Sequence, residues 1–349
     1  MPDHIIDIAK TFTVKELPNS EIEFSGTLSP EVVAPYTQRA LKHITEHLEL
    51  PGFRKGHVPA DMARQRVGDV AVLEEAVELA IQDLYPALVL EHKIDAVGRP
   101  EIRILKLAPG NPVDVVAKTA VYPKLELPKN WKTTGEKIAL EATIPTTDEE
   151  VATTLESLRK SRATKNETGE EVVPELTDEF AQSVGAFADL EGLKIQIKKG
   201  MTEEKERAAR DKRRGTIIDA LLEKVKVAIP NIFVESELDK IISQMREDIA
   251  RFGMTLEQYL TNTKKTEEAV RGEFRDQAHK RAKLQLTLNK VADEEKLEPD
   301  TATVDEEMKH ATEHFPDARP DLLRVHIETV LRNEKALQLL EGKTDTETK

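Results

Sequence analysis

Apolar residues recur at helical spacing through almost all of the second half of the chain, and this pattern favours long amphipathic helices. The clearest run has i, i+4, i+7 and i+8 spacing and consists of Val234, Leu238, Ile241, Ile242, Met245, Ile249 and Phe252. The same spacing predicts further helices over about residues 191–227, 266–291 and 304–315, and one that follows Pro320 and ends at Gly342. The default interpretation of each residue in such a stripe is packing in a core.

The composition indicates how these helices pack. Charged residues make up 33% of the 349 residues, whereas aromatic residues make up only 4%. Charged helices with few aromatic side chains favour helix pairs, or arms, over one large core. Arms leave grooves between them, and scattered Leu, Ile, Val and Met side chains in a groove hold varied apolar segments weakly. The pattern assigns no individual residue to substrate binding.

The first part of the chain, residues 1–122, has a mixed pattern that predicts an α+β domain. We expect strands over residues 5–14, around 22–24, at 102–107 and at 113–122, and helices over about 30–48, with a kink near Pro35, and 69–91. The predicted fold class is therefore an α+β N-terminal domain followed by an extended, mostly α-helical C-terminal domain with arm-like helix pairs. Such a chain is multidomain and elongated.

A linker and a connecting helix are expected over residues 123–175, before the helical domain of residues 176–349. Thr147 is followed three residues later by Glu150, which is the pattern of a capping box at the start of a helix. We expect a polar loop over residues 163–175.

The most distinctive short segment is residues 51–59, Pro-Gly-Phe-Arg-Lys-Gly-His-Val-Pro, called the docking loop below. Gly52 and Gly56 permit backbone angles that a Cβ forbids, so the segment predicts a tight exposed loop between two helices with Phe53, Arg54 and Lys55 at its tip. One interpretation is an ordinary helix–helix turn whose Phe53 folds back onto the core. The other is a tip that binds an anionic, partly apolar surface such as ribosomal RNA with protein.

Composition also excludes several classes of function. The net charge of −14 argues against a protein that coats DNA or RNA, so contact with RNA must be local. The absence of cysteine excludes disulfides and thiol catalysis. We find no signal peptide and no apolar run long enough to cross a membrane, so a cytoplasmic protein is expected. The chain lacks both GxxxxGK[ST] and GxGxxG, so we predict no nucleotide cofactor and no ATP-driven action.

The docking loop resembles the ribosome-attachment loop of the trigger factor family of bacterial nascent-chain chaperones. Further resemblance lies in residues 158–164, 174–180 and 229–238, so it covers most of the chain. It implies an ATP-independent holdase that docks at the ribosomal tunnel exit and shelters nascent or unfolded polypeptides in a helical cradle. It also implies that Phe53, Arg54 and Lys55, with Gly52 and Gly56, bind ribosomal protein and rRNA of the large subunit. Self-association into a homodimer when free is a further expectation.

The chain departs from the family at two places. His57 stands where the family usually carries a cation, and because His is mostly neutral at pH 7, docking is expected to be weaker. Trigger factors carry a peptidyl-prolyl isomerase domain between segments like 158–164 and 174–180, whereas this chain has only a short polar loop there. Isomerase activity is therefore not implied, and we predict that the protein is not an enzyme.

Three other interpretations remain open at this stage. One is a ribosome-independent holdase or assembly chaperone, and another is a purely structural helical protein. The third is a zinc peptidase, because H-x-x-E-H occurs at His43–His47 and at His310–His314 and places two histidines on one helical face. Neither motif has an evident third ligand, so we predict no metal site.

Overall fold

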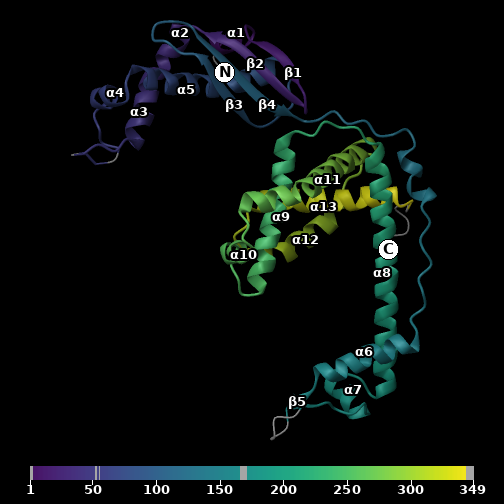
Figure 1. Cartoon of the computed structure of the whole chain (residues 1–349). Coiled ribbons are helices and arrows are strands. Elements are labelled where there is room, and N and C mark those ends of the chain that lie inside the picture. The colour runs from purple at the N-terminus through teal and green to yellow at the C-terminus, as the bar shows by residue number, and fades with distance from the viewer. Residues whose placement is uncertain (1–2, 52, 55, 166–170, 343–349) are drawn as a thin grey trace. The chain divides into compact units, whose positions relative to one another are not determined.

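The computed structural model describes residues 3–51, 53–54, 56–165 and 171–342 (Figure 1). The chain divides into two compact units. The first unit contains Met1–Glu126 and Lys226–Thr287, and the second contains Leu127–Val225 and Leu288–Lys349. The predicted borders at residues 122 and 175 stay predictions.

The N-terminal part of the first unit is built on a four-stranded antiparallel sheet in the order β1-β2-β4-β3. The strands are β1 Thr13–Leu17, β2 Glu21–Leu28, β3 Ala96–Lys106 and β4 Val113–Val121. In β2 the apolar residues Ile22 and Phe24 alternate with less buried polar ones, and both are buried in the core. One face of the sheet therefore packs on the core, which is common in antiparallel sheets whose other face is solvated.

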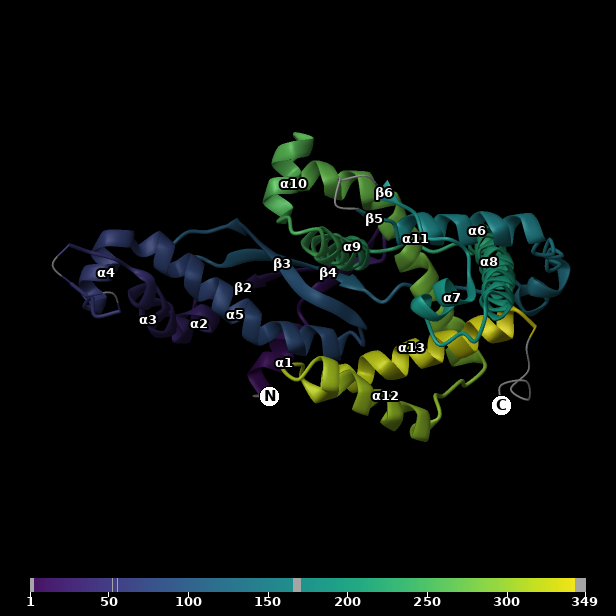
Figure 2. The same ribbon diagram turned by 90° about the horizontal axis from the view of Figure 1, so that it is seen from below.

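Helices cover this buried face, and the longest of them supplies the largest share of the buried core residues. They are α1 Asp3–Ala9, α2 Pro30–Val33, α3 Thr37–His47, α4 Ala60–Val67 and α5 Asp69–Glu91. α5 buries Ile81 and Leu88 completely in the cluster that contains Phe24 and Leu28 of β2. α3 lies along α5 (Figure 2), and Arg39 of α3 donates a 2.7 Å hydrogen bond to Asp83 of α5. The predicted α+β class of this domain is confirmed.

Two predicted segments differ from the structure. The prediction of a strand over residues 5–14 is wrong, because Ile8 and Ala9 pack against the core from the helix α1, which contacts α5, and the strand begins only at Thr13. The polar segment 163–175 is not entirely loop, since β5 Thr164–Lys165 pairs with β6 Glu171–Val172. The kink near Pro35 is present as a 3-10 turn over Ala34–Tyr36.

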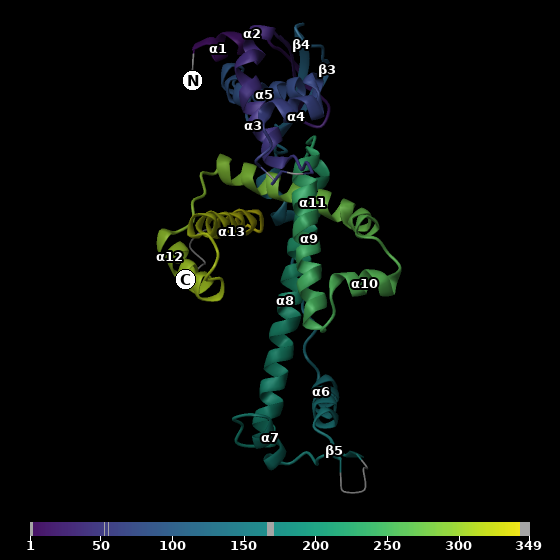
Figure 3. The same ribbon diagram turned by 90° about the vertical axis from the view of Figure 1, so that its left-hand side faces the viewer.

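The rest of the chain is mostly helical, as predicted. In the first unit, α9 Asn231–Arg251 is followed by α10 Leu256–Thr263 and α11 Glu267–Glu294, which runs on past the border of that unit (Figure 3). The second unit contains α6 Asp148–Ser161, α7 Asp178–Val184, α8 Leu190–Lys224, α12 Thr301–His314 and α13 Pro320–Leu340. α12 and α13 lie side by side (Figure 2).

Ion pairs join α9 to α11. Arg271 donates hydrogen bonds of 2.7 Å to Glu235 and 2.8 Å to Asp239, and Arg275 donates one of 2.9 Å to Glu235. The hydrogen bond from Arg271, together with that from Arg275, lowers the pKa of Glu235 below its ordinary value. These contacts join the two helices beside the apolar cluster that contains Ile242 of α9 and Val270 of α11.

In the second unit, two neighbouring arginines join α8 to two distant segments, and we call this group the arginine junction. Arg213 donates hydrogen bonds to the carbonyl oxygens of Gly135 at 2.9 Å, Ile138 at 2.7 Å and Glu341 at 3.2 Å. Arg214 donates to the carboxylates of Glu334 and Glu341. Gly135 itself lies against the end of α13, where an added Cβ would stand 1.9 Å from the carbonyl oxygen of Leu340.

We predict that Gly135→Ala destabilises the protein while Gly200→Ala stabilises it. The methyl group that alanine adds at position 135 meets the backbone of Leu340 and forces a shift that costs at least about 2 kcal/mol. Gly200 lies inside α8 with open space around it, so alanine there improves helix propensity by about 1 kcal/mol. Urea unfolding followed by fluorescence of Trp131, the single and buried tryptophan, measures both. Equal midpoints for the two variants would contradict the close approach at Gly135.

The lowered pKa of Glu235 predicts that the α9–α11 contact weakens in acid. A carboxylate whose folded pKa is depressed adds stability above the ordinary value of 4.5, and this stability is lost as the pH falls through the folded pKa. Glu235→Gln should therefore lower the urea midpoint at pH 7 and flatten its decline between pH 7 and 3. Glu247→Gln is the matched control, because this exposed residue of α9 forms no ion pair with any described residue. Parallel pH profiles for wild type and Glu235→Gln would refute the assignment.

Candidate functional site

The docking loop connects α3 to α4 and is closed by two backbone hydrogen bonds. The Phe53 N–H donates to the Leu50 carbonyl at 3.1 Å, and the His57 N–H donates to the Arg54 carbonyl at 3.0 Å. Gly56 has φ of +80°, with no atom within 4 Å of where a Cβ would stand. Glycine is the residue that adopts this angle without strain.

The side chains of this loop divide into an anchor and an exposed tip. Val58 is buried, whereas Phe53 keeps 38% of its surface exposed and Arg54 and His57 are exposed. Two of the five predicted attachment residues, Gly52 and Lys55, lie outside the described residues. The structure thus brings Phe53 and Arg54 together at the surface, where a cation and an aromatic ring are available to a partner.

The two H-x-x-E-H motifs have different surroundings. In α3 the His43 and His47 rings are 5.0 Å apart, and Nδ1 of His43 lies 2.7 Å from Oε1 of Glu75 on α5. In α12 both His310 and His314 are exposed. Among the described residues no group of three His, Asp or Glu side chains is arranged to hold a metal ion. Catalytic zinc usually requires three protein ligands, and neither motif supplies them here.

An apolar hollow in the first unit lies among α9, α10 and α11, and we call it the arm pocket. Its volume is about 510 Å³, and it is lined by Ile241, Gln244, Met245, Asp248, Ile249, Phe252, Met254, Tyr259, Phe274, Gln277 and Arg281. Phe252 is 86% exposed, so it stands at the rim instead of in a core. The pocket combines aromatic and methionine side chains with a few polar groups, as sites for varied apolar ligands do.

Local sequence signals determine the turn between α9 and α10 at this pocket. α9 ends next to Gly253, which has φ of +72°, and Thr255 starts α10 with a capping box completed by Gln258. The chain therefore turns sharply between two helices and leaves Met254 at the corner. The apolar spacing identified Met245, Ile249 and Phe252 but assigned them to a core. It did not predict that Tyr259 of α10 and Phe274 of α11 line the same pocket as these α9 residues.

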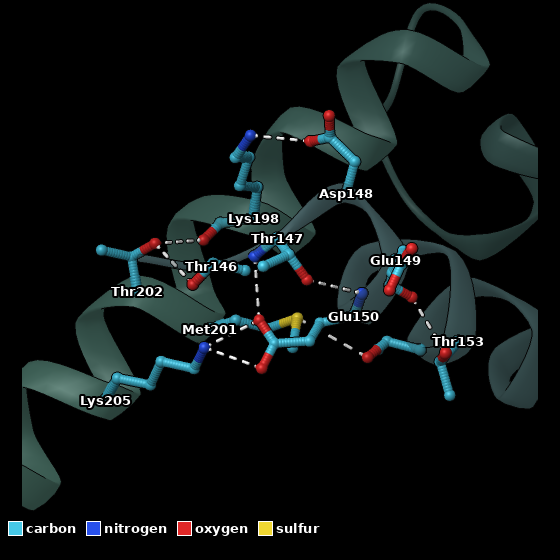
Figure 4. Close-up of polar contacts among 11 residues, drawn as sticks. Thr146, Thr147, Asp148, Glu149, Glu150, Thr153, Lys198, Met201, Thr202 and Lys205 are labelled. Atoms are coloured by element: carbon cyan, nitrogen blue, oxygen red, sulfur yellow. Dashed lines mark hydrogen bonds and ion pairs between the residues drawn. The ribbon is translucent and has the colours of Figure 1, made fainter. Parts of the chain in front are cut away.

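A second group of contacts joins the start of α6 to α8 (Figure 4). The predicted capping box is confirmed: Glu150 N–H donates to Thr147 Oγ1 at 3.2 Å, and Thr147 N–H donates to Glu150 at 2.9 Å. Lys205 of α8 donates to both oxygens of the same carboxylate, at 2.8 and 2.7 Å, and lowers the pKa of Glu150. Lys198 donates to Asp148 at 2.8 Å. We call this group the α6–α8 clamp.

An apolar cluster completes the packing at this end of α8. Leu155 of α6, Phe180 and Ala181 of α7 and Leu193 of α8 are buried together. The short β5–β6 pair joins α6 to the segment that leads into α7. The described ends of this connection are thus paired as two short antiparallel strands. No helix in the described part of the chain is long and apolar enough to cross a membrane.

Comparisons with known proteins agree with these features. The family model described as "Bacterial trigger factor protein (TF)" matches residues 10–158, and the one described as "Bacterial trigger factor protein (TF) C-terminus" matches residues 189–341. Residues 159–188 remain between the two matches, which is too short for a domain of about 100 residues.

Curated relatives cover most of the chain. Trigger factor of Halothermothrix orenii is 24% identical over an alignment of 405 positions, covering 90% of this chain and 92% of the relative. Trigger factor of Macrococcus caseolyticus is 26% identical, with 83% and 87% covered, and that of Salinispora arenicola is 27% identical, with 86% and 84% covered.

A solved structure described as "Promiscuous Substrate Recognition in Folding and Assembly Activities of the Trigger Factor Chaperone" is similar over 95% of this chain and 99% of that one. Its sequence identity to this chain is 18% and the TM-score is 0.49. The two family models together span most of the sequence, from residue 10 to residue 158 and from 189 to 341. The chain therefore belongs to the bacterial trigger factor family.

Proposed function

We propose that this chain is an ATP-independent holdase chaperone that docks on the large ribosomal subunit near the tunnel exit and shelters nascent or unfolded polypeptides. Membership in the trigger factor family is the observation that carries this proposal. The exposed docking loop and the arm pocket support its two halves, attachment and client binding.

The charge of the protein and the cationic and aromatic side chains of the docking loop support attachment through this loop. The protein has a net charge of −14, so phosphate repels most of its surface and only a local cationic group brings it to RNA. Arg54 and Lys55 would pair with phosphate or acidic side chains, while Phe53 would fill an apolar recess. Gly52 and Gly56 would permit the tight turn that presents these side chains.

Client binding requires apolar surface that is available without unfolding the protein. The arm pocket offers this surface, since Met245, Ile249 and Phe274 line it beside the exposed Phe252 ring. Unbranched methionine side chains adapt to ligands of different shape. A shallow site of this kind binds briefly and releases passively, which suits a chaperone without ATP.

The proposal includes no catalytic activity, no cofactor and no metal. The segment between the family matches is too short for an isomerase domain, and the β5–β6 pair and α7 lie in it. We place the protein in the cytoplasm, where ribosomes are available to it, and we expect it to self-associate as a homodimer when free.

A second candidate is a holdase that works without the ribosome. His57 favours it, because it stands where the family usually carries a cation and leaves Arg54 and Lys55 as the permanent charges of the docking loop. The two candidates differ in ribosome binding and agree in client binding.

We expect Phe53→Ala/Arg54→Ala/Lys55→Ala to abolish co-sedimentation with bacterial ribosomes. The triple variant removes the apolar and cationic groups of the tip, and each lost phosphate contact also lowers the salt sensitivity of binding. Sedimentation at two salt concentrations measures both effects. Arg103→Ala is a control, because this exposed arginine lies on β3 outside the docking loop. If wild type also fails to sediment, the ribosome-independent candidate replaces the first one.

We expect Phe252→Ser to weaken binding of an unfolded client about fivefold or more, because it removes the aromatic ring at the rim of the arm pocket. The stability of the protein should hardly change, since this side chain is exposed. Leu105→Ser on β3 is the matched control, being 67% exposed and outside the pocket. Fluorescence anisotropy with a labelled unfolded peptide measures the affinity. Equal losses for both variants would show that the arm pocket is not the binding site.

A further inference from the structure

Two thioether side chains line the arm pocket. The sequence contains six methionines and no cysteine, so thioethers are its only sulfur groups. Two of the six, Met245 and Met254, line the arm pocket, and both are partly exposed. An oxidant that reacts with sulfur therefore attacks this protein at accessible thioethers, and two of these lie where clients are proposed to bind.

The two methionines are placed so that oxidation changes the pocket without breaking the fold. Met245 packs on the small cluster of Ile242, Leu256 and Val270 from the pocket side. Met254 lies in the turn between α9 and α10, and Nδ2 of Asn262 donates a hydrogen bond to its Sδ at 3.9 Å. The amide at this distance is a donor that can serve an added sulfoxide oxygen.

The remaining methionines of the described chain provide internal comparisons. Met201 of α8 accepts a hydrogen bond from Thr154 Oγ1 at 3.5 Å, and it lies in the second unit beside the α6–α8 clamp. Met62 is exposed on α4, and Met308 is partly exposed on α12. Neither Met62 nor Met308 lines the arm pocket. Oxidation at these positions should leave client binding unchanged.

We propose that Met245 and Met254 form a reversible oxidation site through which hypochlorous acid closes the arm pocket to apolar clients. In this step the thioether sulfur loses two electrons and forms an S–O bond, the O–Cl bond of hypochlorous acid breaks, and chloride and a proton are released. Methionine sulfoxide reductases of both stereospecificities restore the thioether. The proposal rests on the proposed client-binding function of the arm pocket.

The physical consequence follows from the polarity of the sulfoxide. Its oxygen is a strong hydrogen-bond acceptor, which an apolar client must desolvate when it enters the pocket. Oxidation also removes the soft thioether surface that fits varied ligands. We expect the two sulfoxides together to lower the affinity for an apolar peptide about tenfold.

The test uses the full chain and a labelled, unfolded apolar peptide that lacks methionine and cysteine. Affinity is measured before oxidation, after hypochlorous acid and after repair by methionine sulfoxide reductases A and B. Three proteins are compared: wild type, Met245→Leu/Met254→Leu, and Met62→Leu/Met308→Leu. Leucine is close to methionine in volume, so the variants should fold, and each protein is compared with its own affinity before oxidation. Peptide mass spectrometry locates each sulfoxide.

The proposal expects wild type and Met62→Leu/Met308→Leu to lose affinity about tenfold on oxidation and to recover it after repair. Met245→Leu/Met254→Leu should keep its affinity throughout. The proposal is overturned if that variant also loses affinity, if wild type keeps its affinity with both sulfoxides present, or if neither methionine is oxidised when Met62 is. Failure of the client-binding function itself appears separately, as unchanged binding of unoxidised Phe252→Ser.

Discussion

The second unit depends on the hydrogen bonds that Arg213 and Arg214 donate from the middle of α8. Their acceptors come from a 3-10 turn at Gly135 and from Glu334 and Glu341 at the end of α13, which are far apart in sequence. The paired carboxylates of Glu341 and Glu334 raise the pKa of Arg214 further above its ordinary value. A few charge-assisted hydrogen bonds therefore fix a fold that lacks a large aromatic core.

Charge-assisted hydrogen bonds also join two other pairs of helices beside apolar clusters. Arg271 joins α9 to α11 beside the arm pocket, and Lys205 joins α8 to the capping box of α6. Ion pairs of this kind stabilise a defined geometry while the apolar side chains between the helices stay accessible. The arm pocket is the result, because its walls are held by polar contacts and Met245 and Phe252 are left available.

Local signals in the sequence predicted those elements whose cause is local. α5 begins at Asp69 and ends at Glu91 as its stripe indicated, and Thr147 with Glu150 forms the expected capping box. Contacts between distant segments had no such signal, so the partner of Glu150, Lys205, was not predicted. Residues 5–14 were misassigned because β-branched residues are frequent in strands, yet here burial against α5 favours a helix. The same limit applies to Phe252, whose helical spacing is compatible with either core or rim.

The β5–β6 pair has a consequence for how proteins of this architecture gain and lose modules. Thr164 lies opposite Val172 and Lys165 opposite Glu171, so residues 165 and 171, which flank the segment between the two strands, are neighbours. Neighbouring ends are what a guest module needs, because it can then be spliced in or excised without moving the flanking helices. The clamp around Glu150 and the cluster around Phe180 hold those helices from within the host. Evolution could therefore remove an enzymatic module here while the scaffold stays intact, and a protein engineer could add a reporter at the same seam.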